Sequence, residues 1–180
     1  MPEGSRDELV VPRSAWAERD VRLLPLIPGR RIRHTWVHHT RRRLPGGAAS
    51  DEAAERAFMR DLEDYHVDTR GFRAVGYSFV IMPGGRTYEG RGWGMLGAHT
   101  LRRNGNSYGI ALVGNFDEDQ PTPEALSACL ALIRLGIEGG HLSGTDHPTG
   151  GHGDVADTPC PGVNLTSWLR GARAELRPSR

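Results

Sequence analysis

Apolar residues recur along the chain with two spacings, and the longer spacing predicts helices. Over residues 51–65 they recur every three to four positions, which is typical of an amphipathic helix, and Ser50 or Asp51 can cap its first turn. A second helix is predicted after Thr122, because Pro123 suits a first helical turn. A third is predicted over residues 165–176. The apolar face of the second helix comprises Leu126, Cys129, Leu130, Ile133 and Ile137.

Shorter apolar runs bounded by turn residues predict strands. They cover residues 32–40, 75–82 and 109–115, and a Pro-Gly-Gly turn joins the second run to residues 86–89 in a hairpin. Helices and strands mixed in this order around one sheet predict an α/β or α+β fold. A length of 180 residues suits one domain. We expect a disordered segment over residues 1–12 and a folded domain over residues 13–176.

Composition and charge exclude several classes of protein. The formal net charge is +1, which gives the whole chain no strong attraction for nucleic acid or a membrane surface. No run approaches the roughly 20 apolar residues that span a bilayer, so we expect no membrane insertion. Residues 1–11 lack the apolar core of a signal peptide. All 23 cationic residues are arginine, and one cluster, which we interpret as a solvated face, contains Arg30, Arg31, Arg33, Arg41, Arg42 and Arg43.

Candidate chemistry is concentrated at the end of the first strand and in the Gly-, Pro- and His-rich loop over residues 139–161. His38 ends the strand, and His152 and Cys160 lie in the loop. Imidazole and thiolate are favoured zinc ligands, and three of them leave a fourth position for water. The spacing is not that of a zinc finger, so from these residues alone metal binding and a structural role stay equally open. His147, in the same loop, is a rival to His152.

The remaining histidines and Cys129 have simpler interpretations. His39 must point to the opposite face of the strand from His38 and is expected to pack there. His66, at a helix C-terminus, is interpreted as structural. We expect His34, His141 and His147 at the surface, and Cys129 in the core.

Six motifs in order resemble the peptidoglycan recognition protein and type-2 N-acetylmuramoyl-L-alanine amidase family. The resemblance extends from about Arg13 to Trp168. The motifs are Val-His-His-Thr at 37–40, Arg-Gly-Phe with Val-Gly-Tyr-Ser-Phe at 70–79, Tyr-Glu-Gly-Arg-Gly-Trp at 88–93, Gly-Ala-His-Thr at 97–100, Asn-Ser-Tyr-Gly-Ile-Ala-Leu-Val-Gly-Asn-Phe at 106–116, and Gly-His-Gly-Asp-Val with Thr-Pro-Cys-Pro-Gly at 151–162.

The resemblance implies an α/β fold, a central mixed β-sheet flanked by helices, with Zn²⁺ at the floor of a groove. It implies His38, His152 and Cys160 as the metal ligands. Tyr77 matches a family tyrosine that acts near the activated water and the scissile carbonyl. Thr158 stands where relatives carry Lys or Thr, and it offers a neutral hydroxyl where Lys would offer a positive charge to the oxyanion.

Two further positions match residues that line the muropeptide cleft in the family, namely Trp93 and His99. For Trp93 the alternative of a core anchor stays equally open. The chain also departs from the family pattern, with Ala74 where Asp is common and Gly153 in place of Arg or a similar residue. Neither position is a predicted ligand, but both affect the surroundings of the predicted site.

The activity that the resemblance implies is hydrolysis of the amide between the lactyl group of N-acetylmuramic acid and L-alanine of the stem peptide. The partner is bacterial peptidoglycan, and we expect a monomer that does not bind nucleic acid. One alternative is a non-catalytic peptidoglycan receptor, which typically lacks the Cys ligand. Another is a structural zinc protein that binds nucleic acid, which requires four ligands. We expect action at the cell wall, by a secreted enzyme with a trimmed leader or by a phage endolysin made in the host cytoplasm.

Overall fold

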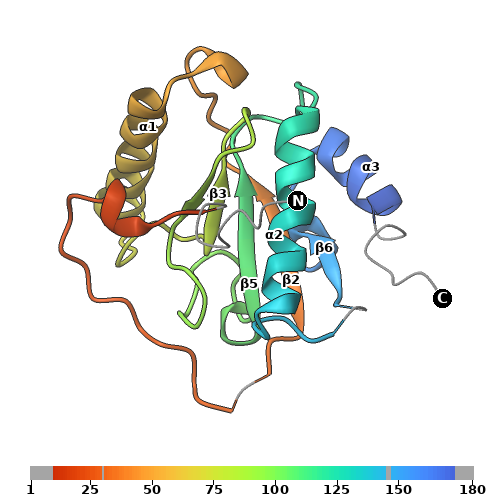
Figure 1. Cartoon of the computed structure of the whole chain (residues 1–180). Coiled ribbons are helices and arrows are strands. Elements are labelled where there is room, and N and C mark those ends of the chain that lie inside the picture. The colour runs from red at the N-terminus through yellow and green to blue at the C-terminus, as the bar shows by residue number, and fades with distance from the viewer. Residues whose placement is uncertain (1–9, 30, 145–146, 173–180) are drawn as a thin grey trace, which may run out of the picture.

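A six-stranded mixed sheet forms the centre of the computed structural model, which describes residues 10–29, 31–144 and 147–172 (Figure 1). Neighbouring strands are parallel except for the antiparallel pair β3–β4. This confirms the α/β class and the predicted hairpin. The strands, in their order across the sheet, are β1 (Val10–Val11), β4 (Thr87–Glu89), β3 (Phe79–Ile81), β5 (Ser107–Leu112), β2 (His34–His39) and β6 (Thr149–Gly151).

The three predicted helices are confirmed, and side chains cap two of them as expected. They are α1 (Glu52–Asp64), α2 (Pro123–Glu138) and α3 (Val163–Ala172). The Asp51 carboxylate accepts from the N–H of Ala54, and the Thr122 hydroxyl accepts from the N–H of Ala125. The predicted end of the third helix, residues 173–176, lies outside the described residues. Among the described residues no helix is both long and apolar enough to cross a membrane.

Short helical turns connect these elements. A π-helical turn over Tyr65–Thr69 continues α1, and 3₁₀ turns cover Arg13–Ala15, Gly47–Ala49, Asn104–Asn106 and His152–Asp154.

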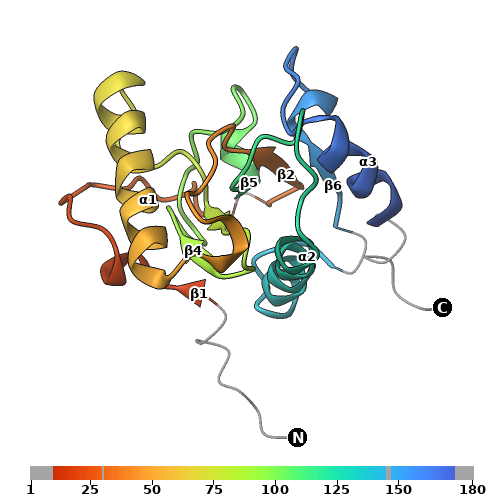
Figure 2. The same ribbon diagram turned by 90° about the horizontal axis from the view of Figure 1, so that it is seen from above.

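The strand register decides which side chains share a face of the sheet. Val37, Ile110 and Phe79 lie side by side on three adjacent strands and belong to one apolar cluster, which α2 and α3 cover. One residue further along, His38 is level with Ala111 and Val80. Side chains alternate along a strand, so this second row points to the opposite face, where Val80 packs with α1 residues. Figure 2 shows α1 and α2 separated by the strands.

Two strands form where none was predicted. Val10 and Val11 pair with β4, so the prediction of disorder over residues 1–12 is wrong at these two positions; residues 1–9 lie outside the described residues. β6 contains two glycines, which have low strand propensity, and it forms by pairing with β2. A Cβ on Gly150 would lie 2.8 Å from the Trp36 ring, so the glycine permits close packing there. Conversely, the predicted strand over 75–82 is regular only at Phe79–Ile81.

Two histidines outside the candidate site are buried and hydrogen-bonded. His147 was expected at the surface, and this is wrong: its ring lies between the hydroxyls of Thr35 and Ser143. His66 accepts a hydrogen bond from the N–H of Gly76 through Nδ1, which confirms a structural role. Burial lowers the pKa of each to about 4. Both rings are therefore neutral in the folded protein near neutral pH.

The metal-free protein is expected to lose stability as the pH falls from 6.5 towards 4. In that window the unfolded chain protonates His66 and His147 while the folded chain does not, so each contributes a slope of up to about 1.4 kcal/mol per pH unit. Urea unfolding across this range measures the slope. His147→Gln should flatten it, and His141→Gln, which changes an exposed ring, should flatten it less. An unchanged slope in His147→Gln would contradict the assignment.

Candidate metal centre

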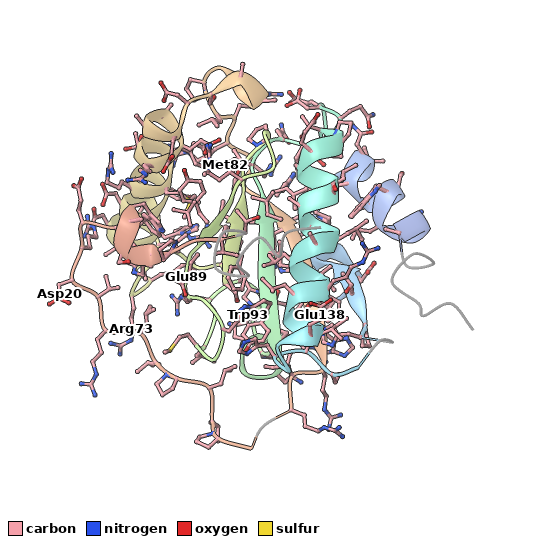
Figure 3. The ribbon with its side chains drawn as sticks, in the orientation of Figure 1. Asp20, Arg73, Met82, Glu89, Trp93 and Glu138 are labelled. Carbon is pink, nitrogen blue, oxygen red and sulfur yellow. The ribbon has the colours of Figure 1, made fainter. Side chains whose placement is uncertain are left out.

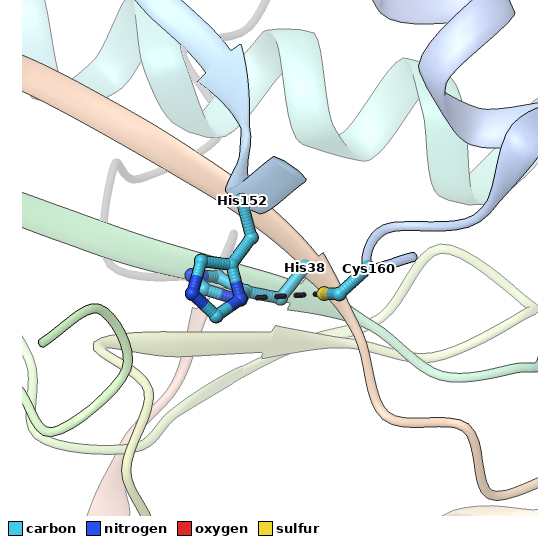
Figure 4. Close-up of side chains that lie close together, drawn as sticks. All are labelled: His38, His152 and Cys160. Atoms are coloured by element: carbon cyan, nitrogen blue, oxygen red, sulfur yellow. Dashed lines mark hydrogen bonds between the residues drawn. The ribbon is translucent and has the colours of Figure 1, made fainter. Parts of the chain in front are cut away.

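Three side chains from separate parts of the chain meet at one end of the sheet (Figure 4). His38 lies in β2, His152 begins the turn after β6, and Cys160 lies in the loop before α3. One ligand atom from each lies within 4.8 Å of the others. Gly151 pairs with Val37, so the chain reaches the level of His38 at His152. The two imidazole rings lie 4.6 Å apart between centroids.

The geometry of these donors fits a zinc ion. The Sγ atom of Cys160 lies 3.7 Å from Nδ1 of His38. Zn–N and Zn–S bonds in a tetrahedral site place such a pair about 3.6 Å apart. Burial lowers the pKa of His38 well below its usual range and also lowers that of His152. Both imidazoles are therefore neutral and offer lone pairs, as metal ligation requires.

Backbone contacts hold Cys160 in place. Burial raises the pKa of its thiol to about 11, and a hydrogen bond from the backbone of His39 acts in the opposite direction. A bound cation would favour the thiolate more strongly. The Cys160 carbonyl accepts from the N–H of Gly153 at 2.7 Å. A Cβ on Gly153 would lie 3.1 Å from that carbonyl oxygen, so a glycine suits this departure from the family pattern.

Thr158 contacts the same loop. Its hydroxyl oxygen accepts from the N–H of Cys160 at 3.2 Å, so the side chain braces the turn that carries the thiol. The hydroxyl proton is not used in this bond and can be donated elsewhere. The structure thus places Thr158 beside the cluster and gives it a contact that the sequence did not predict.

Tyr77 lies beside His38, with 5.3 Å between ring centroids. Burial, and then the charge of Cys160, raises the pKa of the Tyr77 phenol above its ordinary value. The hydroxyl therefore stays protonated through the neutral range and is a hydrogen-bond donor. This is the state that the predicted role requires.

Three buried side chains hold the backbone on either side of Tyr77. Glu63 accepts from the N–H of Val75, and His66 accepts from the N–H of Gly76. The Arg91 guanidinium donates to the Val75 carbonyl at 2.8 Å and to the Leu96 carbonyl at 2.8 Å. The sequence indicated a structural role for His66 but no role for Glu63 or Arg91, although Arg91 stands within a motif. The hydrogen bonds to Val75 and Gly76 join residues 10 to 16 positions apart in the sequence, so no periodic pattern of neighbouring residues predicts them.

The two predicted groove residues lie on opposite faces of the sheet. His99 contacts His38, with 3.2 Å between its Nδ1 atom and Nε2 of His38. Trp93 instead packs on Phe79 and Tyr108, with centroids 4.4 and 4.8 Å away, and belongs with the cluster that α2 covers. In Figure 3 it lies near the end of α2 marked by Glu138. Trp93 therefore occupies the position of a core anchor, and the structure does not bring it to the metal centre.

The described residues do not complete a closed zinc site. The group that could hold a metal contains three donors there, with no fourth His, Cys, Asp or Glu, and His147 is not part of it.

The described arginines of the cluster lie beyond opposite ends of β2. Arg41 pairs with Asp117, and Arg43 pairs with Glu118 and Asp119, whereas Arg33 lies at the start of the strand. The closed site and the continuous basic face expected of a nucleic-acid-binding zinc protein are both missing from this part of the chain.

Comparison with known sequences agrees with this arrangement. The N-acetylmuramoyl-L-alanine amidase family matches residues 28–163. The chain is 36% identical to a human N-acetylmuramoyl-L-alanine amidase over 175 residues, covering 94% of this chain and 30% of the human protein. It is 32% identical to the peptidoglycan-recognition protein SC1a of Drosophila melanogaster, covering 90% of this chain and 84% of that protein. The chain thus spans less than a third of the human relative.

Solved structures show the same fold. A bumblebee recognition protein, PGRP-SA, superimposes with a TM-score of 0.82 at 33% identity, covering 89% of this chain and 93% of that one. Peptidoglycan recognition protein LE, solved with tracheal cytotoxin, a monomeric diaminopimelic acid-type peptidoglycan, also gives 0.82 at 32% identity, covering 91% and 93%. The chain belongs to the family of N-acetylmuramoyl-L-alanine amidases and peptidoglycan recognition proteins.

Proposed function

We propose that this protein hydrolyses the amide between the lactyl group of N-acetylmuramic acid and L-alanine in peptidoglycan, with zinc as its cofactor. The observation that carries the proposal is the three-donor group of His38, His152 and Cys160. Three donors hold an ion and leave a coordination position for the reaction, whereas a structural site uses four. The donor set also matches the preference of zinc for imidazole and thiolate.

The three donors and the two residues beside them have different tasks in the proposed reaction. His38, His152 and Cys160 would hold the zinc ion, which when bound supplies Lewis acidity and an activated water. The Tyr77 hydroxyl donates a hydrogen bond to the carbonyl oxygen of the scissile amide as negative charge develops on it. Thr158 keeps the Cys160 turn closed, and its proton is free for a second donation towards the same oxygen.

Relatives support the choice of substrate. One relative is named as an amidase of this specificity, and one solved relative is bound to a monomeric peptidoglycan fragment. Because the chain spans only part of the human amidase, its substrate is inferred from the shared domain.

The test is to incubate purified protein with peptidoglycan and to measure bound zinc and newly released L-alanine amino termini. We expect about one zinc per chain and a steady release of amino termini, which chelator abolishes and added zinc restores. The single variant His152→Ala should release none, and a chelated wild-type sample is its control. Wild-type protein that carries zinc and binds peptidoglycan, yet releases no amino termini, would refute the hydrolase and favour the receptor.

A further inference from the structure

The His99 imidazole packs closely against the backbone of two glycines. A Cβ on Gly97 would lie 2.4 Å from Cδ2 of His99, and a Cβ on Gly109 would lie 2.4 Å from its Cγ. His99 as a whole residue is 9% exposed. A side chain at either position would collide with the ring, so both glycines permit its close packing in the wall of the site, where little of His99 remains exposed.

The Asn104 side chain holds the loop that carries His99. The side-chain oxygen of Asn104 accepts from the N–H of His99 and from the N–H of Thr100, both at 2.9 Å. The Thr100 hydroxyl lies 3.0 Å from Nδ1 of His99. The two Asn104 bonds fix the backbone that carries the ring, and Nδ1 lies 3.2 Å from Nε2 of His38. The Thr100 hydroxyl lies farther from that Nε2 atom, at 3.5 Å.

The two nitrogens of His38 therefore face different partners. Nδ1 faces the Cys160 sulfur, and Nε2 faces His99. A neutral imidazole that gives its Nδ1 lone pair to a metal must carry its proton on Nε2. We propose that His99 is a positioning residue of the metal centre: its Nδ1 accepts the Nε2–H of His38, and this bond fixes the tautomer and ring orientation that direct the other nitrogen to the ion.

This inference rests on the proposed zinc site and concerns binding of zinc itself. Partners of this kind typically contribute 10- to 100-fold to metal affinity. His99→Leu, which removes the acceptor, is therefore expected to weaken zinc binding by about 10- to 100-fold in competition with a chromophoric chelator. His147→Leu, a buried histidine outside the group, is the matched control and should leave zinc affinity within about twofold.

A second pair of variants separates positioning from general packing. The side-chain oxygen of His99→Asn lies close to the position of Nδ1, whereas that of His99→Gln extends towards the position of Nε2. Asn should therefore retain clearly tighter zinc binding than Gln, and this comparison decides the matter if His99→Leu does not fold. Equal zinc affinity in wild type, His99→Leu and both amide variants would overturn the positioning role of His99 and leave the proposed function intact. Wild-type protein that binds no zinc would overturn the proposed function and this inference with it.

Discussion

Replacing Cys160 by serine is expected to remove stoichiometric zinc and to lower amide cleavage by more than about 100-fold. This loss exceeds the roughly 10- to 100-fold loss that is typical when a hydrogen-bond partner of a metal ligand is replaced. A serine hydroxyl gives up its proton far less readily than a thiol, so the site keeps only the two imidazole donors. Burial already raises the pKa of the Cys160 thiol to about 11, because this position disfavours a negative charge when no cation is bound. Zinc content and release of amino termini measure the two effects on one preparation.

The second cysteine provides the control for this substitution. Cys129 is buried in the cluster beneath α2, on the opposite face of the sheet from His38. Cys129→Ala should keep one zinc per chain and full cleavage, with a loss of stability of about 1 kcal/mol. A Cys160→Ser protein that retains both zinc and the wild-type rate would exclude the thiolate as a ligand.

Tyr77→Phe is expected to lower kcat by about 100- to 1000-fold, the loss that follows removal of one donor to a developing oxyanion. Zinc content and KM should change little, because the phenol is not among the ligands and acts on the transition state. In the metal-free protein, burial raises the pKa of Tyr77 and so favours the protonated donor. The ratio of the two rates should therefore be constant between pH 6 and 9.

Tyr108→Phe is the matched control for the loss of a phenolic hydroxyl. The Tyr108 oxygen accepts from the N–H of Gly94 on the opposite face of the sheet, so its removal should cost about 1 kcal/mol of stability and leave kcat unchanged. Full activity in Tyr77→Phe would remove the phenol from the mechanism. A rate ratio that varies with pH would indicate that the phenol titrates within the range measured.

The packing of Trp93 shows that a motif alone does not predict which face of the sheet a side chain contacts. Trp93 is the last residue of a motif that the family shares, but its position along the chain does not specify a face of the sheet. The side chain packs between Phe79 and the stacked His141 ring, on the side away from His38. Only the path of the chain after β4 decides this, because residues 90–93 turn away from the regular strand and its alternation of faces.

The sequence by itself determined the elements whose signals are local. The caps at Asp51 and Thr122 lie three residues from the N–H groups they accept from, and the alternation along one strand was enough to separate His38 from His39. The six motifs added the family and the identity of the candidate ligands. Each of these signals depends on spacing within a few residues or on the order of motifs, and therefore needs no knowledge of distant contacts.

The tertiary structure alone decided which distant residues meet. Cys160 lies 122 positions from His38, and His99 lies 61 positions from it, so their contacts depend on strand order and on the closure of long loops. The same holds for β6, which contains two glycines and becomes a strand only because β2 offers it an edge. Helix caps and strand alternation are encoded in neighbouring residues, whereas the metal centre is created by packing between remote ones.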